Sequence, residues 1–148
     1  MRTLAKRRAW SENLWRTLLL LRVVAVVASL RLLVSIVTLR RILDWLTPRS
    51  DYLVQDGRSF PKVVRYTDAL VRRLASWAGS PCLLRSLALY YFATRCGFAV
   101  KLHCGIRRAG DALEGHAWLS LHDKPFFESG LPDLTYAITF TFPPAQTV

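Results

Sequence analysis

The sequence predicts an α+β protein in which helices come first and a small antiparallel sheet follows. Three observations support this fold class. The first half of the chain is apolar with helical periodicity, a mostly apolar helix is expected just after the middle, and from Gly97 onward the segments are short and rich in strand-forming residues. We therefore expect a buried helix packed on one face of a small sheet.

Two regions are predicted along the chain. Residues 1–58 form a basic, apolar region in which Trp10–Leu46 is expected to be one or two long helices rich in Leu, Val and Arg. Residues 59–148 form the predicted core domain. It begins with a helix over Lys62–Trp77, where apolar residues recur every three or four positions.

The next helix is predicted over Pro81–Thr94. Ser80 suits its N-cap position, and proline is well tolerated in the first turn of a helix. Leu83–Phe92 is apolar apart from Arg85 and Ser86. A helix with so few polar positions is expected to be buried on most sides.

Short strands are predicted after this helix. The candidate strands are Phe98–Arg107, Gly115–Leu121, Pro125–Glu128 and Thr135–Phe142, with turns at Arg108–Glu114 and His122–Lys124. The last strand alternates apolar and polar side chains, so its apolar residues are expected to share one face of the sheet. They are Tyr136, Ile138, Phe140 and Phe142.

Charge and cysteine content limit the partners and the compartment. The formal net charge of +11 favours an acidic partner, such as an acidic peptide, an anionic lipid or a nucleic acid. The basic residues are scattered and no recognised nucleic-acid motif accompanies them, so we do not expect nucleic-acid binding. Three cysteines cannot complete an internal disulfide framework, which favours a reducing, cytoplasmic compartment.

An apolar stretch from Leu14 to Leu39 follows the basic N-terminus. Arg22 and Arg31 interrupt it, and its longest uninterrupted piece, Val23–Leu30, is shorter than the roughly 20 residues that a membrane span needs. We therefore expect this segment to lie on a membrane surface or on a partner protein rather than to cross the membrane.

Cys82 is the candidate nucleophile. A catalytic cysteine reacts as its thiolate, and a helix N-terminus favours that anion through its unpaired N–H groups and partial positive charge. Ser80 and Pro81 place Cys82 at such a position, whereas Cys96 lies at a helix end and Cys104 inside a strand. From its position alone, a cysteine of this kind is more often a buried packing residue.

His116 is the candidate base for Cys82. It lies at the start of a predicted strand between two small residues, which leave room for another chain to approach the imidazole. A single histidine in a strand is more often structural, but His103 and His122 have no comparable setting. Trp118 follows two positions later, so it should share a face of the strand with His116.

A catalytic histidine also needs an orienting group, and Asp123 and Glu128 are the candidates. Asp123 lies about 20 Å along an extended strand from His116. A tight turn would bring Glu128 back to within a residue or two of facing His116. We therefore predict Glu128 as the third member of the triad and Asp123 as a turn residue.

Three sequence blocks carry a family resemblance. They are Pro81–Ser86, Leu102–Arg108 and Gly115–Leu119. In this order and spacing they resemble the stand-alone leader peptidase of lasso peptide biosynthesis, a family of the transglutaminase-like superfamily. The resemblance covers roughly Ser80 to Glu128. It implies a papain-like fold, with Cys82 matching the nucleophile, His116 the base and Glu128 the acid.

The resemblance also implies a function. Such a cysteine protease removes the leader from a ribosomally synthesised precursor peptide, with a separate leader-recognition protein and a macrolactam synthetase as partners, and without a metal or cofactor. The sequence departs from the family at Ser120 and Lys124, where members often carry Glu and Gly. Two other interpretations remain open: a transglutaminase-like acyl transferase or amidase using the same triad, and a non-catalytic, membrane-associated scaffold.

Overall fold

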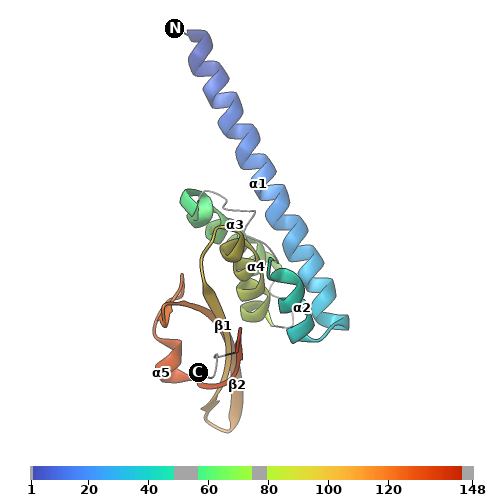
Figure 1. The fold of residues 1–148 in the computed structure, drawn as a ribbon, viewed down its shortest axis with the longest axis vertical. Coiled ribbons are helices and arrows are strands. Elements are labelled where there is room, and N and C mark those ends of the chain that lie inside the picture. The colour runs from blue at the N-terminus through green and yellow to red at the C-terminus, as the bar shows by residue number, and fades with distance from the viewer. Residues whose placement is uncertain (1, 49–56, 75–79, 145–148) are drawn as a thin grey trace.

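The computed structural model describes residues 2–48, 57–74 and 80–144, with the side chains of the first helix from Asn13 onward. The elements in chain order are α1 (Arg2–Ile36), α2 (Leu39–Leu46), the 3-10 turn η1 (Gly57–Ser59), α3 (Phe60–Leu74), α4 (Pro81–Arg95), β1 (Val100–Ala109), β2 (Ala112–Leu121), β3 (Lys124–Pro125), α5 (Pro132–Thr135) and β4 (Ala137–Phe142). The four strands form one antiparallel sheet in the order β3-β2-β1-β4. The predicted α+β class is confirmed, and α1 projects well beyond the rest of the molecule (Figure 1).

Helix α4 lies at the centre of the molecule, as its apolar sequence predicts. Eight of its residues are buried, and it contacts α1 and α3 as well as strands β1 and β2. Gly97 follows the helix with a φ of 80°, a left-handed conformation that glycine adopts at little cost and that ends the helix. Ser80 occupies the N-cap position, but its side chain makes no capping hydrogen bond.

Strands β1 and β2 form a long hairpin that pairs over the full ten residues of each strand. The turn predicted at Arg108–Glu114 is therefore shorter than expected, and the chain reverses at Gly110 and Asp111. Arg107 and Glu114 lie directly opposite each other and form an ion pair of 2.6 Å. Cross-strand pairs of this kind extend a ladder into residues whose composition suggests a loop.

The strand predicted at Pro125–Glu128 is wrong in its extent, because only Lys124–Pro125 pairs with β2. Aromatic packing accounts for the difference. The rings of Phe126 and Phe127 both lie 5.3 Å from the ring of Phe60 on α3. Phe127 also adopts a φ of 51°, which turns the chain away from the sheet edge.

The prediction that the apolar residues of β4 share one face is also wrong. The register shifts between Cys104 and Gly105, so that Phe140 pairs with Cys104 and Ile138 pairs with Gly105. Thr139 is the extra residue of a β-bulge, which puts the residues on its two sides on opposite faces. Phe140 packs against the core, whereas Ile138 is 48% exposed.

Among the described residues, Asn13–Ile36 is the segment whose length and composition would suffice to cross a membrane. Its mean hydropathy is 2.3, and 17% of its apolar 18-residue window is buried against the protein. Helix α1 contacts both α3 and α4, so it packs on the region predicted as the core domain, whose boundary at residues 58 and 59 remains a prediction. The predicted helix end at Trp77 lies outside the described residues.

Candidate active site

Cys82 is the second residue of α4 and is partly exposed. The backbone N–H groups of a first helical turn have no partner within the helix, and they carry its partial positive charge. The structure places Cys82 where the sequence predicted, at the start of the buried helix.

The other cysteine near this position is Cys104 on β1. Burial raises the pKa of the Cys104 thiol to about 11, and the charge of Cys82 adds to the rise. The two side chains therefore lie near enough for their charges to interact. At neutral pH the Cys104 thiol therefore carries less thiolate than an ordinary cysteine, which makes it the weaker candidate nucleophile.

The structure brings His116 and Glu128 together. Nε2 of His116 lies 3.8 Å from Oε1 of Glu128, a distance longer than a hydrogen bond but short enough for an ion pair when the imidazole is protonated. The His116 ring stacks on Trp118 with centroids 5.9 Å apart and lies 5.2 Å from the ring of Tyr136. This arrangement leaves Nδ1 as the ring nitrogen that does not face the carboxylate. It also confirms that His116 and Trp118 share a face.

Gly105 lies directly opposite His116 in the hairpin. A Cβ atom at this position would lie 3.0 Å from Trp118 Cη2, from Tyr136 Cβ and from the carbonyl oxygen of Ala137. A larger residue would push these groups apart. The aromatic walls around the imidazole therefore depend on a glycine at this position of β1.

Arg85 ties Glu128 to α4, a role that we did not assign from the sequence. Its guanidinium donates from Nε to Asp68 Oδ1 at 2.7 Å, from Nη1 to Glu128 Oε2 at 3.0 Å and from Nη2 to the Phe127 carbonyl at 2.7 Å. Arg85 follows Cys82 by three positions, so the two are neighbours on the helix surface. The carboxylate that faces the histidine is thus held beside the turn that carries the candidate nucleophile.

The sequence contained a signal for this network. Arg85 is the one charged residue between Leu83 and Phe92. A charged residue in a buried helix needs an ionic partner, because removing it from water without one is costly. The sequence could not identify the partners, because Asp68 lies on α3 and Glu128 follows β3.

A buried hydrogen bond fixes α4 against β2. Ser86 Oγ donates to the carbonyl oxygen of Ala117 at 2.9 Å, one turn after Cys82 on the helix and one residue after His116 on the strand. Alternation along β2 puts Ala117 on the face toward α4 and His116 on the face of Trp118. No hydrogen bond joins Cys82 to His116 within the described part of the chain.

The other polar candidates have structural roles. Asp123 is 83% exposed and lies in the turn after β2, and its ion pair with Lys101 lowers the pKa of its carboxyl. The prediction of Asp123 as a turn residue is confirmed. His103 is hydrogen-bonded to Ser120 at 2.8 Å and to Thr141 at 3.0 Å, and burial lowers the pKa of its imidazole.

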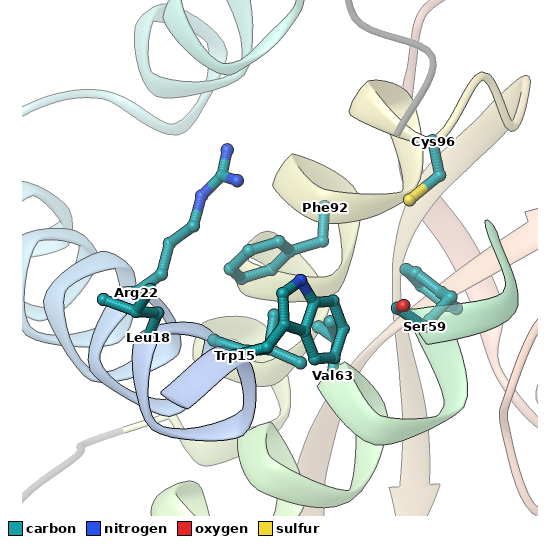
Figure 2. A pocket seen from close by; sticks show the side chains of 9 residues that line it. Trp15, Leu18, Arg22, Ser59, Val63, Phe92 and Cys96 are labelled. Atoms are coloured by element: carbon teal, nitrogen blue, oxygen red, sulfur yellow. The ribbon is translucent and has the colours of Figure 1, made fainter. Parts of the chain in front are cut away.

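Two hollows lie outside this cluster. An apolar pocket of about 400 Å³ lies between α1, α3 and α4, and it reaches the far end of α4 at Cys96 (Figure 2). An open concave surface of about 700 Å³ lies beside the β1–β2 hairpin and α5. Residues along it include Ile106, Arg108, Leu113 and Leu134. No cluster of three or more His, Cys, Asp or Glu side chains suited to a metal ion occurs among the described residues.

Comparison with known proteins identifies the family. The model of the transglutaminase-like superfamily matches residues 17–141, which is most of the chain. No curated protein and no solved structure matches it. The superfamily carries out cysteine protease and acyltransferase chemistry, which agrees with a cysteine at the start of a buried helix and a histidine near a carboxylate that Arg85 ties to that helix. The chain belongs to the transglutaminase-like superfamily.

Proposed function

We propose that this protein is a cysteine peptidase that cleaves the leader from a ribosomally synthesised lasso peptide precursor. The observation that carries the proposal is the approach of His116 to Glu128 at 3.8 Å, with Glu128 held by Arg85 beside the turn of α4 that contains Cys82. The class of reaction follows from the superfamily. The class of substrate follows from the three sequence blocks that resemble the lasso leader peptidases.

In the proposed reaction the Cys82 thiolate attacks the scissile carbonyl carbon, and the leaving amine takes a proton from His116. The resulting thioester is hydrolysed by a water molecule that gives a proton back to His116. Glu128 orients the imidazole and stabilises its protonated form. Because catalytic hydrogen bonds often tighten only when substrate is bound, contact between Cys82 and Nδ1 of His116 on binding is part of the proposal.

The substrate would lie along the concave surface beside the hairpin. Ile106 follows Cys104 by two positions, so it lies on the same face of β1, and Figure 1 shows the hairpin running past the N-terminal end of α4. Leu113 and Leu134 are 72% and 83% exposed on this surface, beside Arg108. Apolar residues of the precursor would contact the two leucines, and acidic residues would pair with Arg108. A separate leader-recognition protein would present the precursor, and the synthetase would receive the product.

The test is leader cleavage followed by mass spectrometry, with purified protein, a lasso-type precursor and its recognition protein. Wild type should release the leader. Cys82→Ala and His116→Ala should abolish release, and Glu128→Gln should slow it by about 10²-fold or more. Cys96→Ala is the matched control, because it removes a thiol from the opposite end of the same helix and should cleave like wild type.

Three outcomes would contradict the proposal or part of it. Equal cleavage by Cys82→Ala would show that another group is the nucleophile. Transfer of the acyl group to an added primary amine in preference to water would identify an acyl transferase. If the wild-type protein leaves the precursor intact in the presence of the recognition protein, the assignment of a lasso precursor as the substrate is wrong.

A further inference from the structure

The outward face of α1 is apolar over an unusual length. Its large side chains are exposed, whereas Val23, Val27 and Leu30 are buried against the protein. Trp15 and Leu18 are exposed too, but they line the pocket against α3 and α4. The exposed apolar residues that do not line it are Leu14, Leu20, Leu21, Val24, Leu32, Val34 and Ile36. They follow one another over roughly 20 residues of helix, or about 30 Å. Soluble monomers rarely expose a continuous apolar surface of this size.

The two charged residues of this segment are both partly buried. From Thr17 to Ile36 they are Arg22 and Arg31. The Arg22 guanidinium lies 5.7 Å from the centre of the Phe92 ring on α4 (Figure 2). Arg31 donates to Ser35 at 3.0 Å. The sequence alone suggests that arginines interrupt the apolar face, but in the structure neither arginine is fully exposed.

Basic residues flank this face at both ends. Arg2, Lys6, Arg7 and Arg8 belong to the first turns of α1 by sequence. Arg16 lies beside Lys62 and Arg65 of α3 where the exposed stretch begins, and Arg40 and Arg41 are exposed where it ends. An apolar surface between clusters of positive charge complements anionic phospholipid, whose headgroups meet the charges while its acyl chains meet the leucines.

The packing of α1 decides its orientation. A membrane span would surround the helix with lipid on all sides. In this structure Val23, Val27 and Leu30 are instead buried in the protein, where α1 contacts α3 and α4. Helix α3 exposes Arg65, Arg72 and Arg73, so it would carry charges into the hydrocarbon. We infer that α1 lies in the plane of an anionic membrane surface, with its exposed apolar face in the headgroup region. This inference does not depend on the proposed peptidase activity.

The test is sedimentation of the full chain with vesicles of phosphatidylcholine alone or of equal parts phosphatidylcholine and phosphatidylglycerol. We expect at least tenfold tighter binding to the anionic vesicles, and weaker binding at high salt. The triple variant Leu21→Gln, Val24→Gln, Leu32→Gln should lower that binding at least tenfold, since these exposed side chains share the outward face. The control Leu113→Gln, Leu134→Gln removes equally exposed apolar groups from the hairpin and α5 and should bind like wild type.

Three results would overturn the inference. Equal sedimentation with both kinds of vesicle, or undiminished binding by the triple variant, would exclude the anionic surface or the α1 face as its basis. Bound protein that resists extraction with alkaline carbonate would indicate a span. A dimer in solution that the triple variant converts to a monomer, without vesicle binding by wild type, would show that a second copy covers this face.

Discussion

Helices α1 and α4 are both apolar around most of their circumference, yet the fold uses them in opposite ways. Helix α4 buries eight of its residues between other helices and the sheet, whereas from Asn13 onward only Val23, Val27 and Leu30 of α1 are fully buried. The charged residue inside α4, Arg85, is paired with two carboxylates. From Thr17 to Ile36 the charged residues of α1 are the partly buried Arg22 and Arg31, and the large exposed side chains there are apolar.

Apolar composition does not decide whether a helix lies in the protein core or at a membrane. An all-round apolar helix is expected in a protein core or in a membrane, and the two have the same sequence pattern. The contacts distinguish them, because α4 meets both helices and strands, namely α1, α2, α3, β1 and β2, whereas α1 meets helices. The same contacts separate α4, which carries the candidate nucleophile, from α1, whose exposed face suits a membrane surface.

The largest expected difference between the two helices is in stability. Leu87 on α4 is fully buried, and Leu87→Ala should lower the free energy of unfolding by about 2–5 kcal/mol through lost burial and a residual cavity. Leu21 on α1 is 59% exposed, and Leu21→Ala should change it by less than about 0.5 kcal/mol. Urea denaturation in the absence of lipid measures both. Equal losses would mean that the outer face of α1 is covered in solution.

The two ends of α4 should differ in thiol reactivity. Cys82 lies in the first turn of α4, where backbone N–H groups have no partner within the helix, whereas Cys96 follows its last turn. Cys104, with a pKa of about 11 against an ordinary 9.0, should carry about 100-fold less thiolate than an ordinary thiol near neutral pH. Timed alkylation with iodoacetamide at pH 7, read by peptide mapping, should modify Cys82 first and Cys104 last.

The sign of the pH effect on Cys104 follows from its raised pKa. Its thiol stays protonated until the pH approaches 11, so its alkylation should accelerate as the pH rises from 7 to 10. Modification of Cys104 before Cys82 at neutral pH would contradict the assignment of the nucleophile. The variant Cys82→Ala supplies the control, because the remaining modification then reports the other two thiols alone.

The sequence predicted α4 and the hairpin well because each rests on local information. Proline at a helix start, a nearly unbroken apolar run and a glycine after the last turn define α4 within its own residues. The meeting of His116 with Glu128 was predicted from one turn and the return of the chain. The carboxylate reached that position, although the strand expected to carry it is mostly absent.

The failures depend on contacts between distant segments. Phe126 and Phe127 leave the sheet edge to pack on Phe60, which lies more than sixty residues earlier in the chain. The role of Arg85 depends on Asp68 in another helix. Local propensity carries no information about such partners, so tertiary packing decides these positions.

The partly buried ion pairs of Arg85 on α4 can be compared with the exposed ion pair between Lys101 and Asp123. Arg85→Met removes the cation between Asp68 and Glu128, whose side chains are 28% and 11% exposed, and should cost about 1.5–3 kcal/mol of stability. As a positioning residue, Arg85 should affect kcat more than KM and should alter the pH profile of cleavage, with partial rescue by Arg85→Lys. Lys101→Met breaks the exposed pair with Asp123 and should leave both stability and kcat unchanged. A kcat unchanged in folded Arg85→Met would show that the network is structural only.

The smallest expected effect compares one hydroxyl on each helix. Ser86 Oγ on α4 donates across to the Ala117 carbonyl, whereas Thr17 Oγ1 on α1 donates to the Asn13 carbonyl of its own helix, each at 2.9 Å. Ser86→Ala should cost about 1 kcal/mol, because a buried carbonyl loses its partner, and Thr17→Ala should cost almost nothing, because water replaces the hydroxyl. Thermal unfolding of both variants measures the difference.

Ser86 also bears on the distance between Cys82 and His116, because it joins their two elements. Ser86→Ala should therefore reduce kcat for cleavage while KM is maintained. An unchanged kcat would mean that packing alone holds α4 on the sheet.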